Sequence, residues 1–197
     1  SILGRQGCTL HDYATGAEHS PVVPAREQPG PKSVGNGLTF PRNLVGWAEL
    51  HAGVTELADE VAVRLRGHGL KCTTLQVTIR DPNFKDICRQ KRLSAPTYVA
   101  RELTETAMEL IRAAWRENAP VRALTLTAQA LVEEGEAGEQ LDLFAAGAAP
   151  RRDKLEKLEK AMDGIRGKFG RDAIAPASTV HRDRAEVKAE QRLPPVD

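Results

Sequence analysis

The chain has 197 residues, enough for one ordinary domain with appendages or for two small domains. Its 28 basic and 27 acidic residues leave a net charge of +1, so a nucleic-acid surface would have to come from local clustering. Three cysteines without a CxxC pair exclude a disulfide framework and a cysteine-pair zinc site, and no signal peptide or membrane span of roughly 18 apolar residues is visible. We therefore expect a cytoplasmic protein without a membrane partner.

The first 31 residues predict a small element apart from the main domain. Residues 1–24 are expected to end a helix at Gly16 and then to form an exit strand. Residues 25–31, AREQPGP, have the composition of a linker. Because the chain begins with Ser and this segment lacks a core pattern of its own, we expect the C-terminal part of a longer protein.

The next segment predicts a strand and then a helix. Lys32 to Phe40 alternates apolar and small residues, which indicates a strand softened by glycine. Pro41 is expected to end that strand and Asn43 to cap the helix. From Trp47 onward, apolar residues recur at steps of three and four, which is typical of an amphipathic helix.

A two-stranded ribbon is predicted over residues 70–97. Leu75, Val77 and Ile79 fall on one face of its first strand, and polar residues fall on the other. The sequence Asp-Pro-Asn at 81–83 favours a turn, and the second strand is rich in lysine and arginine. The ribbon should therefore have one apolar face and a polar, positively charged remainder.

A second helix follows the ribbon, Pro120 is expected to end it, and residues 121–132 alternate as a fourth strand. The order βαββαβ over residues 32–133 predicts an α+β, ferredoxin-like domain with a four-stranded sheet. Both helices should cover one face of the sheet and leave the other open.

Three segments follow that domain. Residues 134–150 are predicted to be flexible, residues 151–175 to form an amphipathic helix that ends near Gly170, and residues 176–197 to be disordered. The helix could pack on the domain, pair with a partner or merely follow the flexible segment. We take packing on the domain as the default.

Converging titratable groups, which a catalytic site needs, are absent from the pattern. The five histidines are scattered without metal-ligand spacing, and no glycine-rich phosphate loop leads from a strand into a helix. We therefore predict no catalytic residue, no metal and no cofactor in this segment, which is not itself an enzyme.

The basic residues beside the predicted strands are more informative. Backbone phosphates could bind them in a salt-sensitive and sequence-tolerant way, although charge alone favours an ordinary solvated face equally. The strands offer only Phe40 and Phe84 as aromatic residues, so base stacking is disfavoured and contact with a duplex backbone is favoured.

The segment QLDLF places two leucines and a phenylalanine in a tail that is otherwise poor in apolar residues. Exposed apolar side chains of this kind can order in the pocket of a partner, with Gln140 at the rim. The alternative is a segment that folds back on its own domain.

Taken together, KSVGNGLTFPRNL, the ribbon pattern IR…FK…R…L…PT and QLDLF resemble the C-terminal half of Y-family translesion DNA polymerases of the bacterial DinB type. The resemblance covers roughly residues 3–175. It implies that residues 1–24 end the thumb domain and that residues 32–133 form the little finger domain.

The resemblance also implies partners and residue roles. The little finger would grip primer-template DNA with its open face, and QLDLF would bind the bacterial sliding clamp (its beta subunit). The parent would add nucleotides past damaged bases with Mg²⁺ held in a palm domain outside this chain. The implied DNA-binding residues are Lys32, Ser33, Thr39, Arg42, Arg80, Lys85, Arg89 and Lys91, and the implied clamp-binding residues are Gln140, Leu141, Asp142, Leu143 and Phe144.

Three alternatives stay open at this point. The same topology serves RNA-binding modules and small-molecule regulatory or oligomerisation domains. The chain could also be the same region of a catalytically inactive polymerase paralogue.

Overall fold

The computed structural model describes residues 4–22, 24, 30–135 and 149–175, and the chain divides into two units at Gly30. The first unit contains α1 (Gly4–Thr15), which ends as predicted at Gly16 with a left-handed φ of 70°. The predicted exit strand is wrong for the described part of the unit, since residues 17–22 have no strand structure. None of the described strands pairs with these residues, and a single segment cannot form a β ladder alone.

The second unit contains the strands and helices predicted from the sequence, in the predicted order, and a short 3₁₀ helix that was not predicted. They are β1 (Ser33–Leu44), α2 (Trp47–Gly67), β2 (Leu70–Arg80), β3 (Asp86–Thr97), α3 (Ala100–Ala114), β4 (Val121–Glu133), α4 (Ala149–Phe169) and a short 3₁₀ helix, η2 (Arg171–Ala173).

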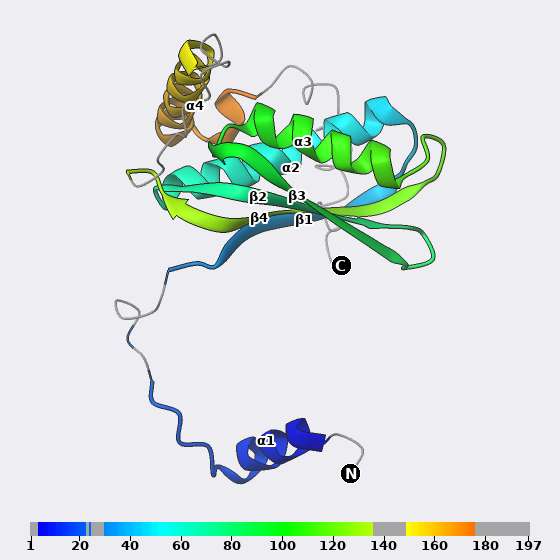
Figure 1. Ribbon diagram of the computed structural model, residues 1–197, viewed down its shortest axis with the longest axis vertical. Helices are drawn as coiled ribbons and strands as arrows, with labels where there is room; N and C mark the ends of the chain where they lie inside the picture. Colours follow the sequence, from blue (N-terminus) through cyan, green and yellow to red (C-terminus); the bar gives the residue numbers. More distant parts are fainter. Residues whose placement is uncertain (1–3, 23, 25–29, 136–148, 176–197) are drawn as a thin grey trace, which may run out of the picture. The chain divides into compact units, whose positions relative to one another are not determined.

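The four strands form one sheet in the order β1-β4-β2-β3, and all three neighbouring pairs are antiparallel. β1 therefore runs parallel to β2 with β4 between them, and β3 runs parallel to β4 with β2 between them. Each of these is a split βαβ unit, so the predicted α+β, ferredoxin-like class is confirmed. Figure 1 shows α2 and α3 on one face of the sheet.

The core lies between that face and the two helices. Alternating residues of β2 and β4, among them Leu75, Val77 and Leu126, are buried against the apolar stripe of α2. Each such side chain contributes about 1.5–3 kcal/mol by leaving water. On α2, Gly53 permits close contact, because a Cβ there would lie 3.1 Å from Phe40 Cζ. The apolar periodicity of the sequence is therefore sufficient to place the core.

The predicted break at Pro41 is wrong. β1 continues through Pro41 to Leu44, with an irregular register between Thr39 and Leu44. β1 is an edge strand, where a residue without an N–H can sit at a bulge. Asn43 accordingly lies in the strand, and α2 begins after Gly46, whose φ of 86° turns the chain.

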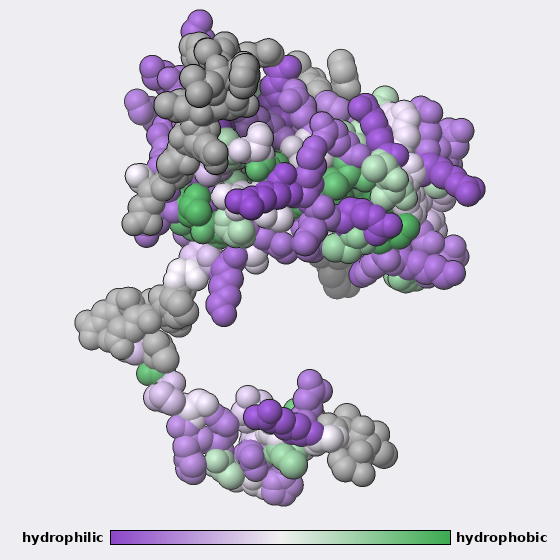
Figure 2. Space-filling model, in the orientation of Figure 1, coloured by the Kyte–Doolittle hydropathy of each residue, from purple (hydrophilic) through white to green (hydrophobic). Residues whose placement is uncertain are grey.

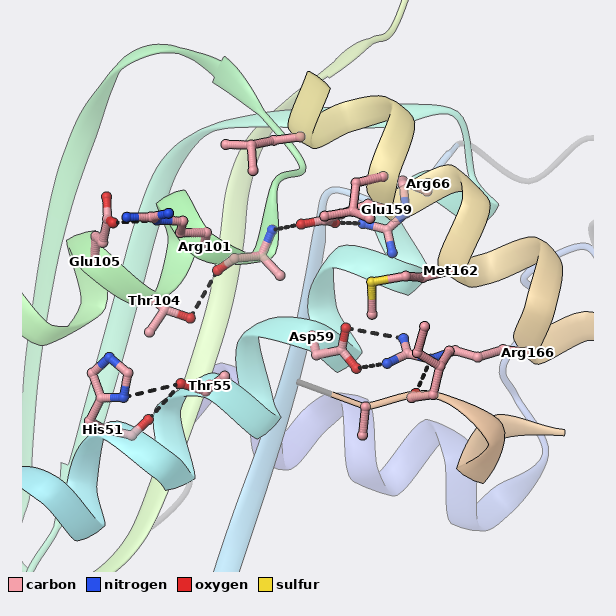
Figure 3. Close-up of a pocket in the computed structure, with 15 residues that line it drawn as sticks. His51, Thr55, Asp59, Arg66, Arg101, Thr104, Glu105, Glu159, Met162 and Arg166 are labelled. Carbon is pink, nitrogen blue, oxygen red and sulfur yellow. Dashed lines mark hydrogen bonds and ion pairs between the residues drawn. The ribbon is translucent and has the colours of Figure 1, made fainter. Parts of the chain in front are cut away.

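Within the second unit, helix α4 packs beside α2, and its docking face is charged. Arg166 of α4 pairs with Asp59 of α2, and Glu159 of α4 pairs with Arg66 of α2 (Figure 3). The apolar stripe predicted for this helix consists of residues 155, 158, 162, 165 and 169, and three of them, Leu158, Ile165 and Phe169, remain exposed. Leu155 alone of that stripe packs against the core cluster.

Candidate nucleic-acid interface

The sheet face opposite α2 and α3 carries mainly hydroxyl and amide side chains. The strand register places residues of the two central strands side by side, because directly paired residues of antiparallel strands share a face. Thr78 is paired with Thr125, Gln76 with Thr127, and Thr74 with Gln129. The central open-face residues of β2 and β4 are Thr74, Gln76, Thr78, Thr125, Thr127 and Gln129.

Several donors on this face are available to a ligand. The hydroxyl groups of Thr78, Thr125 and Thr127 have no hydrogen-bond partner within the described residues. Gln129 Nε2 donates to Gln76 Oε1 across the strands at 3.0 Å and leaves its second N–H hydrogen available. Side chains of this kind bind phosphate oxygens in nucleic-acid complexes.

Two glycines leave the β1 side of the open face without large side chains. Gly35 lies opposite Thr127, and Gly37 lies opposite Thr125. A Cβ on Gly37 would come within 2.7 Å of Thr125 Oγ1, and one on Gly35 within 3.0 Å of Thr127 Oγ1. The threonine side chains therefore occupy the space that larger residues on β1 would need.

Arg80 lies on the open face at the end of β2, and its charge is paired. Its Nε donates to Asp86 Oδ1 at 2.7 Å, and its Nη2 donates to Asp86 Oδ2 at 2.8 Å. This hydrogen-bonded pair holds the pKa of Asp86 below its usual value and that of Arg80 above. Arg80 can meet a phosphate only in competition with Asp86.

Arg89 and Lys91 lie on the other side of the sheet. They are paired with the buried residues Val77 and Leu75, so they share the face that carries the helices. Lys91 Nζ donates to Glu109 of α3 at 2.5 Å. The structure therefore does not place Arg89 and Lys91 on the open face, where the DNA-binding residues were expected. The reason is register, which turns Gln90 and Arg92 of β3 to the open side instead.

Arg42 is also held by a carboxylate. Its two terminal nitrogens donate to the Glu49 oxygens at 2.7 and 2.9 Å, near the start of α2. Glu49 accepts a further hydrogen bond from the backbone N–H of Val45. Arg42 thus joins the end of β1 to α2.

The remaining predicted DNA-binding residues lie on the open face or at its borders. Ser33 and Thr39 are on the open face of β1, and Lys32 directly precedes that strand. Lys85 is in the turn between β2 and β3, where its backbone N–H donates to Asp81 Oδ1 at 2.9 Å. The structure therefore brings Ser33, Thr39 and Arg80 onto one face with lysines at its edge.

Other predictions fall outside this surface. Gln140 to Phe144 lie outside the described residues. The described ranges contain no group of histidine, cysteine and carboxylate side chains that could hold a metal ion. Within the same ranges, no helix has both the length and the apolar character that crossing a bilayer requires.

Comparison with known protein families shows to which family this chain belongs. The family model for the impB/mucB/samB family C-terminal domain matches residues 31–143, which is more than half of the chain. The chain belongs to this family. The predicted resemblance to Y-family DNA polymerases of the DNA polymerase IV type is thereby confirmed.

Individual relatives of this family agree. Over 168 residues the chain is 35% identical to DNA polymerase IV of Acetivibrio thermocellus. This alignment covers 85% of the chain and 41% of that polymerase. It is 34% identical over 173 residues to DNA polymerase IV of Oceanobacillus iheyensis, an alignment that covers 88% of the chain and 40% of the relative. It is 32% identical over 188 residues to DNA polymerase IV of Bacillus velezensis, with 95% of the chain and 44% of the relative covered. The chain thus spans less than half the length of these curated relatives.

The threonine and glutamine residues of the central strands were not predicted as site residues of this impB/mucB/samB family domain. A sequence indicates phosphate ligands mainly by positive charge, and these side chains are neutral. A signal was nevertheless present, because TLQVTI and TLTAQ alternate apolar residues with hydroxyl or amide residues. That alternation places every second residue, here the polar one, on the uncovered face.

Proposed function

We propose that this chain is the DNA-binding and clamp-tethering portion of an error-prone translesion DNA polymerase, and that the open sheet face grips the backbone of duplex primer-template DNA. The parent polymerase adds nucleotides opposite damaged template bases, with Mg²⁺ bound by carboxylates of a palm domain outside this chain. The DNA polymerase IV relatives support this assignment.

The observation that carries the DNA half of the proposal is the chemistry of the open face. Hydroxyl and amide donors cover the two central strands, Gly35 and Gly37 flatten the neighbouring strand, and Lys32 and Lys85 border it. Neutral donors fit phosphate oxygens without reading bases, and no aromatic ring lies among the described open-face residues of the strands. A duplex backbone therefore suits this face better than stacked single-stranded bases.

The DNA half is tested by fluorescence anisotropy with a labelled duplex at several salt concentrations. Binding should weaken as salt rises, and Lys32→Ala and Lys85→Ala should each reduce the slope of log K against log salt by about 1. Arg101→Ala is the matched control, because it removes one positive charge from the exposed side of α3. A slope that the two lysine variants leave unchanged would contradict the proposal.

The clamp half rests on the QLDLF segment and the relatives. Gln140, Leu141, Asp142, Leu143 and Phe144 would enter an apolar cleft of the sliding clamp and hold the polymerase at primer ends. Calorimetry of the chain with a bacterial sliding clamp should give micromolar binding, which Gln140→Ala combined with Leu143→Ala and Phe144→Ala abolishes. Equal binding of both forms, or binding by neither, would contradict tethering by this segment.

A further inference from the structure

The turn between β2 and β3 presents an aromatic ring that the core does not use. Phe84 is 77% exposed and is absent from the side chains packed against the core cluster. Figure 1 shows this hairpin projecting from the sheet away from α4. A large apolar side chain in such a position loses the favourable free energy of burial unless a ligand covers it.

Hydrogen bonds within the turn fix its conformation and keep the Phe84 ring on the outside. The Asp81 carboxylate accepts hydrogen bonds from the N–H groups of Asn83 at 2.7 Å and Lys85 at 2.9 Å. Asp81 N–H donates to Lys85 O at 3.0 Å, and Phe84 N–H donates to Asp81 O at 3.1 Å. These four bonds close the turn on itself and leave the Phe84 side chain outside it.

Phe84 also adopts a conformation that disfavours phenylalanine. Its φ is 61°, in the left-handed region that glycine and asparagine occupy with less strain. A bulky residue that is both strained and exposed is more expected at a ligand contact than at an ordinary turn.

The charge around the ring indicates which class of ligand fits. Residues 80–92 contain five basic and two acidic residues, and two of the basic ones are paired, Arg80 with Asp86 and Lys91 with Glu109. Both acidic side chains are already engaged, Asp81 by backbone N–H groups and Asp86 by Arg80. A single ring beside Lys85 in a basic hairpin matches a polyanion with planar apolar groups, whereas a protein interface would need a broader apolar patch. Figure 2 shows a mainly hydrophilic surface, with hydrophobic residues in separate small patches.

We propose that Phe84 stacks on an unpaired nucleobase where the duplex held by the open face passes into single strand. This inference rests on the proposed DNA-binding function. Bases inside a duplex are already stacked on their neighbours, so the ring can cover a base face only where pairing ends. The positive charge of Lys85 then lies beside the phosphate of the same or the next nucleotide.

The test compares a blunt duplex with a duplex that carries a single-stranded extension, whose first unpaired base is 2-aminopurine. We expect Phe84→Ala in the full chain to weaken binding to the extended DNA by about tenfold and to leave binding to the blunt duplex unchanged. The quenching of 2-aminopurine by the wild-type chain should disappear in this variant and persist in Phe84→Trp.

Asn83→Ala is the control, because the turn uses only the backbone N–H of Asn83. Unchanged binding of Phe84→Ala to the extended DNA would overturn the inference and leave the proposed function standing. Equal weakening on both DNAs would also overturn it, by placing the ring on the duplex. A wild-type chain that binds neither DNA would refute the proposed function and this inference together.

Discussion

Arg66 of α2 and Asp163 of α4 form a two-point ion pair, with Nε–Oδ2 at 2.6 Å and Nη2–Oδ1 at 2.9 Å. The Arg66 side chain is only 6% exposed, and its remaining nitrogen donates to Glu159 and to the carbonyl oxygen of Tyr98. The Arg66 guanidinium carbon also lies over the Tyr98 ring, 5.8 Å from its centre. A single arginine thus joins α2, α4 and the segment before α3.

Replacing Arg66 should loosen α4. Arg66→Ala leaves the carboxylates of Asp163 and Glu159 without their main partner in a largely buried site, so we expect the free energy of unfolding to fall by about 3 kcal/mol. Hydrogen exchange of the α4 amides should accelerate at the same time. Arg101→Ala, which breaks only an exposed pair with Glu105, should change stability by less than about 0.5 kcal/mol. Unchanged α4 exchange in Arg66→Ala would show that other contacts hold the helix.

Glu159 should make stability depend on pH. Burial raises its pKa to about 7 against the pull of Arg66, while Asp59 of α2 and Asp163 of α4 act in the same direction as burial. The folded protein therefore binds more protons than the unfolded chain between about pH 4.5 and pH 7, and the free energy of unfolding falls as pH rises through that window. Above pH 7 the carboxyl group is ionised in both states and the loss is complete.

The variant Glu159→Gln isolates this effect. Its amide oxygen can still accept the hydrogen bond from Ala100 N–H, which is 2.7 Å long in the structure, but the group cannot ionise. The free energy of unfolding of the variant minus that of the wild type should rise by about 2 kcal/mol from pH 5 to pH 8. Denaturant unfolding at both pH values measures the difference. Parallel pH curves for the two proteins would be inconsistent with a raised pKa.

The glycines of β1 make a prediction about packing on the open face. In Gly37→Ala the new Cβ would lie 2.7 Å from Thr125 Oγ1, so the threonine must shift and we expect a loss of about 1–2 kcal/mol. Thr125→Ala removes the obstructing hydroxyl, so Gly37→Ala should cost little in that background. Gly67→Ala on α2 is the control, because a Cβ there meets nothing within 4 Å. Thermal unfolding of the wild type, the two single variants and the double variant measures the coupling between residues 37 and 125. Losses of stability that simply add in the double variant would contradict the predicted contact.

Asp86 should limit DNA binding through Arg80. In Asp86→Asn the guanidinium loses its ionised partner and the hairpin loses a negative charge, so affinity for duplex DNA should rise several-fold at low salt. Glu109→Gln offers a matched control, since it releases Lys91 on the side of the sheet that carries the helices. Anisotropy titrations of both variants measure this, and an equal rise in both would argue against binding by the open face.

The fold of the second unit was predictable because its apolar residues follow the two regular periods. Leu75, Val77 and Ile79 alternate, and the stripe of α2 repeats at three and four, so both the element order and the buried face follow from the pattern. Register does not follow from it. An offset of one residue decides whether Arg89 or Gln90 lies on the open face, and only the paired strands fix that choice.

Packing of α4 on the domain was the default expectation, but the face through which it packs was beyond the sequence pattern. Glu156, Glu159 and Asp163 recur at steps of three and four, as do the apolar residues beside them, but charged stripes usually face solvent. Their partners lie about 85 to 97 residues earlier in the chain, on β2 and α2. Complementarity over that distance appears only when the elements are folded together.

The most direct test of the account places one negative charge on each side of the sheet. Thr125→Glu introduces a carboxylate in the middle of the open face, and Ala113→Glu introduces one on the exposed surface of α3. Binding of duplex DNA is then measured by anisotropy at one salt concentration, after thermal unfolding has confirmed that both variants are folded. Binding lost in Thr125→Glu and retained in Ala113→Glu is the predicted result. Equal binding by both variants would contradict the proposal that the open face grips DNA.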